Sequence, residues 1–378
     1  MQTNPELTPE KLRTNITRML RSQGYEIGNG LIRLPQAATK DDLRRINQMA
    51  CAHRIASAEP VFARLEDKLI RRIAAGEEVV PERIKPRLVR VDGESEDSLL
   101  FRYATLHWSI PVSSGYGRRM RFLVVDESNG KLIGLFGLGD PVYAIKARDE
   151  WIGWDSETKK QRLYHVMDAY VLGAVPPYSM LLGGKLVALM TLSNEVRQIF
   201  TQKYGGTRTL IHNQSKPPWL VLLTTTSALG RSSIYNRVRL DGYNFWRSVG
   251  FTSGSGEFHF SNGIYQQMIA FGQMNCQPTA KSPSWGKGFR NRRELIKKCL
   301  ASIGLSTNLL YHGIRREIFV APLAQNALEF LRGEVRDPDF WDWPADEIAQ
   351  RFLKRWLLPR AERMPEYRSF RRDMYRIW

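Results

Sequence analysis

The chain has 378 residues, of which 43% are hydrophobic and 25% are charged, and its formal net charge at pH 7 is +18. This length and apolar content exclude a disordered linker and predict two or three folded units with sizeable cores. The excess of lysine and arginine favours phosphate-rich partners, because neutralising a polyanion releases its counterions.

Several features predict a soluble cytoplasmic protein. The first ten residues, MQTNPELTPE, are polar and acidic, unlike a signal peptide. The most apolar stretch, 170–190, contains two prolines and Lys185, so we expect no membrane span. The spacing of Cys51, Cys276 and Cys299 fits no metal motif and suits a reducing compartment.

Residues 1–95 predict a helical N-terminal region. Thr8 is a candidate N-cap with Pro9 in the first turn, and Thr39 with Asp42 resembles a capping box for a second helix. A third helix is expected over about 60–75, closed by Gly76. One short strand is expected near 88–91.

Residues 96–275 predict a mixed α/β core. Asn129-Gly130 between two apolar runs is a strong hairpin signal. A strand, a long helix and another strand then predict a right-handed crossover in a mixed sheet. The expected strands are 99–106, 118–127, 132–138, 170–175, 220–226, 258–260 and 265–271, and the expected helices are 183–200 and 232–239.

Residues 276–378 predict a basic loop followed by a helical extension. Helices are expected over 294–303 and 324–331, with a strand over 317–321. A last helix begins near Asp346, and Pro359 is expected to end it. The acidic-aromatic turn 337–343 (DPDFWDW) is either a docking surface or a plug on the core.

The stretch 168–190 leads from a buried strand through Pro176-Pro177 to Gly183 and Gly184, at the start of a helix. The N–H groups of such a loop and the positive end of the helix can hold an anion. Gly183, Gly184 and Lys185 are therefore candidate cofactor-binding residues, although their chemistry does not identify a cofactor.

The order of these elements resembles the GCN5-related acetyltransferase (GNAT) fold. The resemblance covers 118–251 and is carried by FLVVDESNGKLIGLFGL, DAYVLGAVPPYSMLLGGKLVALM, LVLLTTTSALGRSSIYNRV and YNFWRSVGF. It implies an acyl donor at the glycine loop, with Tyr235 as the general acid. Neither Gly183 nor Gly184 aligns that loop with the family's acyl-CoA signature. Tyr235 could instead pack in the core.

The chain as a whole resembles the DruA family of the Druantia anti-phage systems. The resemblance is carried by RDEWIGW (148–154), VLGAVPPYSMLLGGKLVALM (171–190), TTTSALGRSSIYNR (224–237) and GSGEFHF (254–260). It implies a part in bacterial defence against phage, acting on or sensing DNA beside other subunits. It supplies no catalytic mechanism.

Basic residues interleaved with aromatic ones are the candidate nucleic-acid contacts, since bases stack on rings while cations hold phosphates. In the first segment, a tryptophan could instead plug the sheet, and in the second the loop could simply be solvated. The candidates are Arg148 and Trp151, then Lys281, Trp285, Lys287, Arg290, Arg292, Arg293 and Lys297, and finally Arg351 and Arg355 of the tail.

Two weaker sets of residues suggest catalysis. His259 alternates with Phe258 and Phe260 on an expected strand, where it could be a general base or a structural histidine. Asp140, Asp149 and the Glu157-x-Lys159 pattern resemble the carboxylates of metal nucleases. The sequence predicts no metal site beyond this pattern.

Together these features predict a DNA-binding component of a defence system, with a GNAT-like transferase and then a metal nuclease as alternatives. The expected partners are DNA, single- or double-stranded, and other subunits of the system, but no membrane. The sequence also leaves room for a homo-oligomer.

Overall fold

A computed structural model describes residues 7–34, 39–113, 117–208, 215–232, 234–240, 242–260, 263–278 and 289–378. The chain forms two compact units, each assembled from separate stretches of sequence. They therefore do not coincide with the three consecutive segments expected above. The first unit is Met1–Ser57, Ser109–Pro111 and Thr252–Arg316, and the second is Ala58–Trp108, Val112–Phe251 and Glu317–Trp378.

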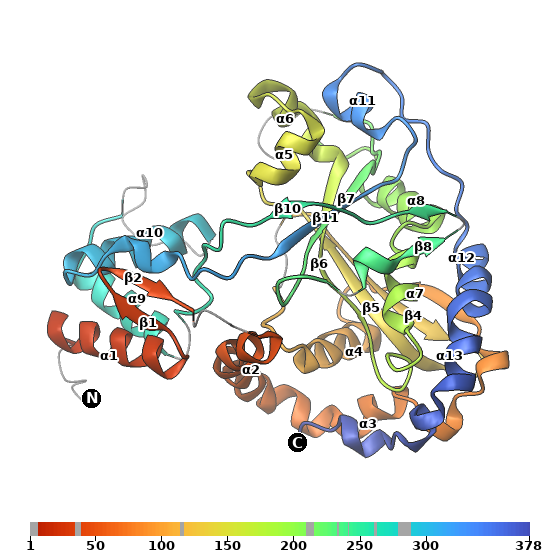
Figure 1. The fold of residues 1–378 in the computed structure, drawn as a ribbon, viewed down its shortest axis with the longest axis horizontal. Coiled ribbons are helices and arrows are strands. Elements are labelled where there is room, and N and C mark those ends of the chain that lie inside the picture. Colours follow the sequence, from red (N-terminus) through yellow and green to blue (C-terminus); the bar gives the residue numbers. More distant parts are fainter. Residues whose placement is uncertain are drawn as a thin grey trace. The chain divides into compact units, whose positions relative to one another are not determined.

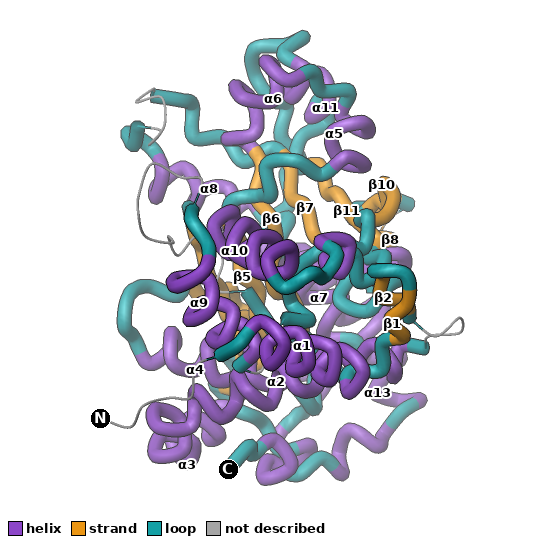
Figure 2. The backbone as a smooth tube through the Cα atoms, turned by 90° about the vertical axis from the view of Figure 1, so that its left-hand side faces the viewer, coloured by secondary structure: helices purple, strands orange, loops and turns teal. Residues whose placement is uncertain are grey.

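The first unit is a small helical body with a two-stranded ribbon. Helices α1, α9 and α10 pack together in both views (Figures 1 and 2). The Thr8 side chain accepts a hydrogen bond from the Lys11 backbone N–H, which confirms the predicted cap. The elements are α1 (Pro9–Ser22), β1 (Glu26–Gly28), β2 (Leu31–Arg33), α9 (Ile264–Asn275), α10 (Phe289–Ser302) and the first part of α2 (Lys40–Phe62).

The predicted capping box at the start of α2 is also confirmed. The Thr39 hydroxyl accepts from the Asp42 N–H at 3.2 Å, and the Asp42 carboxylate accepts from the Thr39 N–H at 2.8 Å. The next helix was expected to begin at Pro60, but α2 runs through this proline to Phe62. Helical turns then continue with interruptions through α3 (Glu66–Leu69).

The second unit is built on a seven-stranded mixed sheet, so the α/β fold class is confirmed. Its strand order is β10-β11-β7-β6-β5-β4-β3. The Asn129-Gly130 hairpin forms between β4 and β5, with Phe122 opposite Phe136. The strands are β3 (Pro86–Arg90), β4 (Arg119–Asp126), β5 (Lys131–Gly139), β6 (Val166–Ala174), β7 (Leu222–Thr226), β10 (Arg247–Phe251) and β11 (Glu317–Pro322).

Among the described strands of this sheet, only β6 and β7 are parallel neighbours, and they pair over just three positions, from Val166–Leu222 to Asp168–Thr224. The rest of β6 runs on beside β5 alone. Between β6 and β7 the chain forms a loop with a cis Pro176-Pro177 peptide and then two helices, where one long helix was expected. These helices are α7 (Gly183–Met190) and α8 (Asn194–Tyr204).

Helices cover both faces of this sheet. Residues of α7, α8 and α12 (Ala345–Phe352) join Phe122 and Val124 of β4 in the main apolar core. Phe101 of α4 (Glu96–Ala104) lies beneath Arg121, which points to the opposite face because side chains alternate along a strand. Helices α5 (Lys146–Ile152), α6 (Ser156–Arg162) and α11 (Ala327–Arg332) gather at one end of the sheet (Figure 1).

Three short apolar segments were assigned the wrong structure. The expected strand 99–106 is helical, because Ser95 caps α4 by accepting from the Ser98 N–H at 3.1 Å. The expected strand 265–271 lies in α9, where Ile264, Met268 and Phe271 form one buried helical face. The expected strand 258–260 is a turn.

The C-terminal helix was expected to end at Pro359, and this is also wrong. After α12, a π-helical turn (Leu353–Leu357) leads into α13 (Leu358–Arg363), with Pro359 in the first turn of α13. A first-turn proline is tolerated because the N–H groups there need no intrahelical partner. Among the described helices, none combines the length and apolar composition that crossing a bilayer requires.

Candidate nucleic-acid interface

The Arg148–Trp154 segment places its two functional candidates in different surroundings. Trp151 is partly exposed and lines an open cleft at one end of the sheet. Arg148 is fully buried. Its guanidinium donates to the carbonyl oxygens of Val142 and Tyr143 at 2.9 and 3.0 Å and pairs with the Asp149 carboxylate at 2.6 Å.

The prediction that Arg148 holds a phosphate is therefore corrected. All three guanidinium nitrogens already donate within the protein, and the side chain has no exposed surface. Lys159 also pairs with Asp149, at 3.0 Å, so this carboxylate is neutralised from two sides. Arg148 is a structural cation that ties α5 to the preceding loop.

The basic segment of the first unit is partly engaged within its own fold. Arg292 lies 4.1 Å from the centre of the Tyr265 ring and Arg293 pairs with Glu257 at 4.0 Å, whereas Lys297 is exposed. Arg290 lies in the first turn of α10. Lys281, Trp285 and Lys287 lie outside the described residues.

The loop before α7 does not present the expected anion cradle. The N–H groups of Ser179, Met180, Leu181 and Gly183 all donate to carbonyl oxygens within 175–178, at 2.9 to 3.0 Å. These donors are unavailable to a phosphate. Gly183 is required for packing instead, since a Cβ there would lie 2.7 Å from the Tyr178 carbonyl oxygen.

Tyr235 also occupies a packing position. Its ring is 8% exposed and lies 5.2 Å from the Trp246 ring and 5.0 Å from the Phe319 ring, measured between centroids. Burial raises the pKa of Tyr235 to about 12. The hydroxyl stays protonated, but the side chain is buried against Trp246 and Phe319 and not exposed as expected of a general acid.

His259 is a buried, neutral histidine of the first unit. Its Nε2 lies 2.8 Å from the Leu309 carbonyl oxygen, and its side chain is 1% exposed. Burial lowers the pKa of His259 to about 4, so the ring is uncharged at pH 7. It therefore does not face a reaction site as a general base, and the structural alternative describes it better.

The nuclease-like carboxylates are engaged elsewhere. Asp140 pairs with Arg118 at 2.7 Å, Asp149 with Arg148 and Lys159, and exposed Glu157 with Lys160 at 3.2 Å. Within the described ranges, the structure contains no group of three or more histidine, cysteine, aspartate or glutamate residues suited to a metal ion.

Lys185 and Arg355 lie over the Trp356 ring on the second unit, and the charge of Arg237 acts on Lys185. We call Lys185, Arg237, Arg355 and Trp356 the cationic cluster. The Lys185 ammonium lies 4.7 Å from the centre of the Trp356 ring, and the Arg355 guanidinium lies 5.2 Å from it. Burial lowers the pKa of Lys185, and the positive charges of Arg237 and Arg355 lower it further. Cations that depress a neighbour's pKa create a local positive potential.

The cluster lacks compensating acids. No carboxylate among the described residues forms an ion pair with Lys185, Arg237 or Arg355. Sequence reasoning identified Lys185 and Arg355 separately but missed Arg237. Its only signal was a place near the end of the TTTSALGRSSIYNR string, which says nothing about its distance from Lys185 or from α12.

Other cations of the tail are already paired. Arg351 pairs with Glu347 at 3.3 Å and lies over the Trp343 ring. Arg372 pairs with Glu78 at 2.6 Å and also donates to the Ile73 carbonyl oxygen. These contacts lie within the second unit, so the cations of the tail are only partly available to an external anion.

The sequence matches known proteins over almost its whole length. A family model described as "Druantia protein DruA" matches residues 37–333. A curated protein of that description from Escherichia coli (strain UMEA 4076-1) is 41% identical over 375 residues, covering 98% of this chain and 93% of that protein. No solved structure gives a significant match. The chain therefore belongs to the DruA family of Druantia proteins.

Proposed function

We propose that the chain is a DNA-binding component of a bacterial anti-phage defence system and binds the phosphate backbone through the cationic cluster. Its membership of the DruA family of Druantia proteins supports the defence role and suggests that other subunits act beside it. The net charge of +18 supports a polyanionic partner.

The observation that carries the proposal is the pair of cations over the Trp356 ring, with a third cation acting on one of them. Lys185 and Arg355 both lie within 5.2 Å of the Trp356 ring centre, and Arg237 adds a third charge. Three like charges held together repel each other, so the site costs stability until an anion neutralises it. A phosphate chain supplies that anion, and releases counterions as it binds.

The additional contacts that we propose are Lys297 of the first unit, which is exposed, and Trp151 of the second. Four other predicted contacts remain proposals, namely Lys281, Trp285, Lys287 and Arg290. We also keep Arg292, Arg293 and Arg351 as proposed contacts, although each side chain would have to give up an internal contact to bind a phosphate. Single- and double-stranded DNA are both compatible with a backbone contact of this kind.

The direct test measures DNA affinity against salt concentration. The variant Lys185→Gln/Arg237→Gln/Arg355→Gln should bind both strand forms more weakly, and the slope of log K against log salt should fall by roughly 2 to 3, about 0.9 per lost phosphate contact. A matched control removes three exposed cations that already have carboxylate partners, in Lys68→Gln/Lys85→Gln/Lys160→Gln.

The control carries the same loss of net charge, so it should retain the slope of the unmodified protein if the cluster is the binding site. Equal effects of the two triple variants would contradict a localised site and indicate a general charge effect. The absence of DNA binding by the unmodified protein at low salt would reject the proposal itself.

The sheet topology supports a second candidate, a GNAT-like acyl- or group-transferase that modifies DNA or protein. The hairpin β4–β5, strand β6, the loop, α7, β7 and a short helical turn at Tyr235–Arg237 follow each other in the order that the resemblance implies. The single parallel pair, β6 and β7, separates after three residue pairs. In this topology, such a separation would be the place for a donor.

The engaged N–H groups of 179–183 and the buried Tyr235 ring weigh against this second candidate. Titration calorimetry with acetyl-CoA tests it directly. Heat of binding together with a higher melting temperature would favour the transferase, whereas no heat and no stabilisation would count against it.

A further inference from the structure

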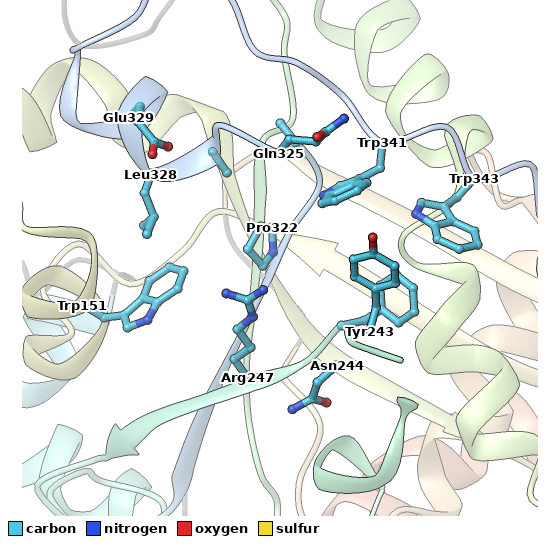
Figure 3. Close-up of a pocket in the computed structure, with 13 residues that line it drawn as sticks. Trp151, Tyr243, Asn244, Arg247, Pro322, Gln325, Leu328, Glu329, Trp341 and Trp343 are labelled. Carbon is cyan, nitrogen blue, oxygen red and sulfur yellow. The ribbon is translucent and has the colours of Figure 1, made fainter. Parts of the chain in front are cut away.

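An open cleft on the second unit has aromatic walls and a cation in its middle. Trp151 of α5 forms one side, and Tyr243 of β9 (Tyr243–Asn244) and Trp341 form the other (Figure 3). The Arg247 side chain rises between them from β10. The empty space around these side chains is about 640 Å³, a volume that includes open solvent.

Hydrogen bonds from α8 hold the segment that carries Trp341 and Trp343 in place. The backbone N–H of Asn194 in α8 donates to the Trp343 carbonyl oxygen at 2.9 Å, and the Asn194 side-chain Oδ1 accepts from the Trp343 N–H at 3.0 Å. The Arg197 guanidinium donates to the Trp341 carbonyl oxygen at 2.7 Å. These contacts fix the segment before any ligand arrives, which lowers the entropy lost on binding.

The aromatic side chains also support each other. The Trp341 and Tyr243 rings meet edge to face at 5.6 Å, and the Trp343 and Phe245 rings do so at 5.2 Å. Tyr243 nevertheless remains 52% exposed. An exposed tyrosine fixed against a clamped tryptophan offers a ready stacking surface, because little ordering is needed for a flat ligand to pack against it.

The charge of the cleft determines which kind of aromatic ligand it can bind. No carboxylate among the described residues pairs with Arg247, which is exposed on an edge strand. A positive charge between the aromatic walls disfavours a quaternary ammonium group, which aromatic sites otherwise attract. Glu329 also lines the cleft, next to Leu328 on the side of Trp151 (Figure 3), so an anionic group of an aromatic ligand should lie at Arg247, away from this carboxylate. Asn244, Gln325 and Glu329 at the cleft supply both donors and acceptors for polar ring edges.

We propose that this cleft captures one unpaired nucleobase, stacked on Tyr243 beside Trp341, with the adjoining phosphate on Arg247. This inference rests on the proposed function, which supplies a DNA strand as the ligand. It adds a preference for single-stranded DNA, because a base paired in a duplex cannot enter the cleft. The shared chemistry is that of a nucleotide, either in a strand or free in solution.

The test measures binding of a single-stranded oligonucleotide, the corresponding duplex and free dAMP to the full chain, by fluorescence anisotropy and tryptophan quenching. Tyr243→Ala and Arg247→Ala should each weaken single-strand binding by about ten-fold, the effect expected for one lost base stack or phosphate contact. Duplex binding should change less than two-fold. The controls Tyr143→Ala and Arg231→Ala remove an exposed tyrosine and an exposed arginine outside the cleft.

The outcomes separate this inference from the proposed function. Unchanged single-strand binding in both cleft variants, with no dAMP quenching that depends on Tyr243, overturns the cleft but leaves backbone binding intact. If neither DNA form binds the unmodified protein, the proposed function fails, and Tyr243-dependent quenching by dAMP then supports a site for a free nucleotide. The absence of that quenching as well overturns the cleft.

Discussion

Two cation–aromatic sites of the second unit differ in one respect that decides their roles. Arg148 lies 5.5 Å from the Trp154 ring centre, much as Arg355 lies 5.2 Å from that of Trp356. Arg148 is fully buried and donates to two carbonyl oxygens and a carboxylate, whereas Arg355 is exposed and has no carboxylate partner among the described residues. An arginine beside an aromatic ring is available to DNA only when its donors are unused.

The largest effect should follow from removing the buried cation. Arg148→Met should lower the free energy of unfolding by about 3–5 kcal/mol, because it leaves two carbonyl groups without their donor and the Asp149 carboxylate paired with Lys159 alone. Urea denaturation measures the change. The control Lys146→Met, in the same helix but 87% exposed, should leave the stability unchanged. Unaltered stability of Arg148→Met would contradict the structural role.

The second effect concerns Asp168, where β6 meets β7. Its carboxylate accepts from the Thr224 hydroxyl at 2.7 Å, and burial raises its pKa to about 6, while Arg148 opposes that rise. The folded protein thus keeps this proton to a higher pH than the unfolded chain, so stability falls as pH rises from about 4 to 6.

Asp168→Asn removes this titration and should be more stable than the unmodified protein by about 3 kcal/mol above pH 6.5, with no advantage below pH 4. Melting temperatures of the two proteins across this pH range measure the difference. A difference that does not vary with pH would show that the carboxyl group titrates alike in the folded and unfolded states.

Arg372, a paired cation of the tail, should contribute to stability and not to DNA binding, unlike the cations of the cluster. Arg372→Gln breaks the contacts with Glu78 and with the Ile73 carbonyl oxygen, which should cost about 1 kcal/mol. Thermal unfolding should detect this loss, while DNA affinity should stay within two-fold. A pronounced loss of affinity without destabilisation would instead assign Arg372 to the interface.

Sequence reasoning succeeded where the signal was local. The Thr8 cap, the Thr39–Asp42 capping box and the Asn129-Gly130 turn depend on a few neighbouring residues, and each forms as predicted. The two wrong strand predictions, 99–106 and 265–271, fall on short apolar runs. The pattern of apolar residues in such a run fits a buried helix as well as a buried strand. A cap at Ser95 and a left-handed Gly263 decided for helices there.

The candidate sites were less predictable, because they depend on distance between remote segments. Basic residues next to aromatic ones were identified throughout, yet sequence alone could not show that Arg148 points inward. Nor could it show that Arg237 lies near Lys185, or that the 337–343 turn forms a wall opposite Trp151. The free or engaged state of a donor is a property of the tertiary structure.

The smallest and most specific effect should come from a single member of the cluster. Arg355→Gln should weaken DNA binding a few-fold and reduce the salt slope by about 0.9, the value for one phosphate contact on duplex DNA. Its exposed side chain makes no ion pair with the described residues and repels Lys185, so the melting temperature should not fall. The slope is decisive, because a lost stacking contact would lower affinity equally at every salt concentration. Arg355→Lys, which keeps the charge, should restore the slope even if some affinity is lost. A slope that stays low in Arg355→Lys would mean that Arg355 acts through its position over Trp356 and not through its charge.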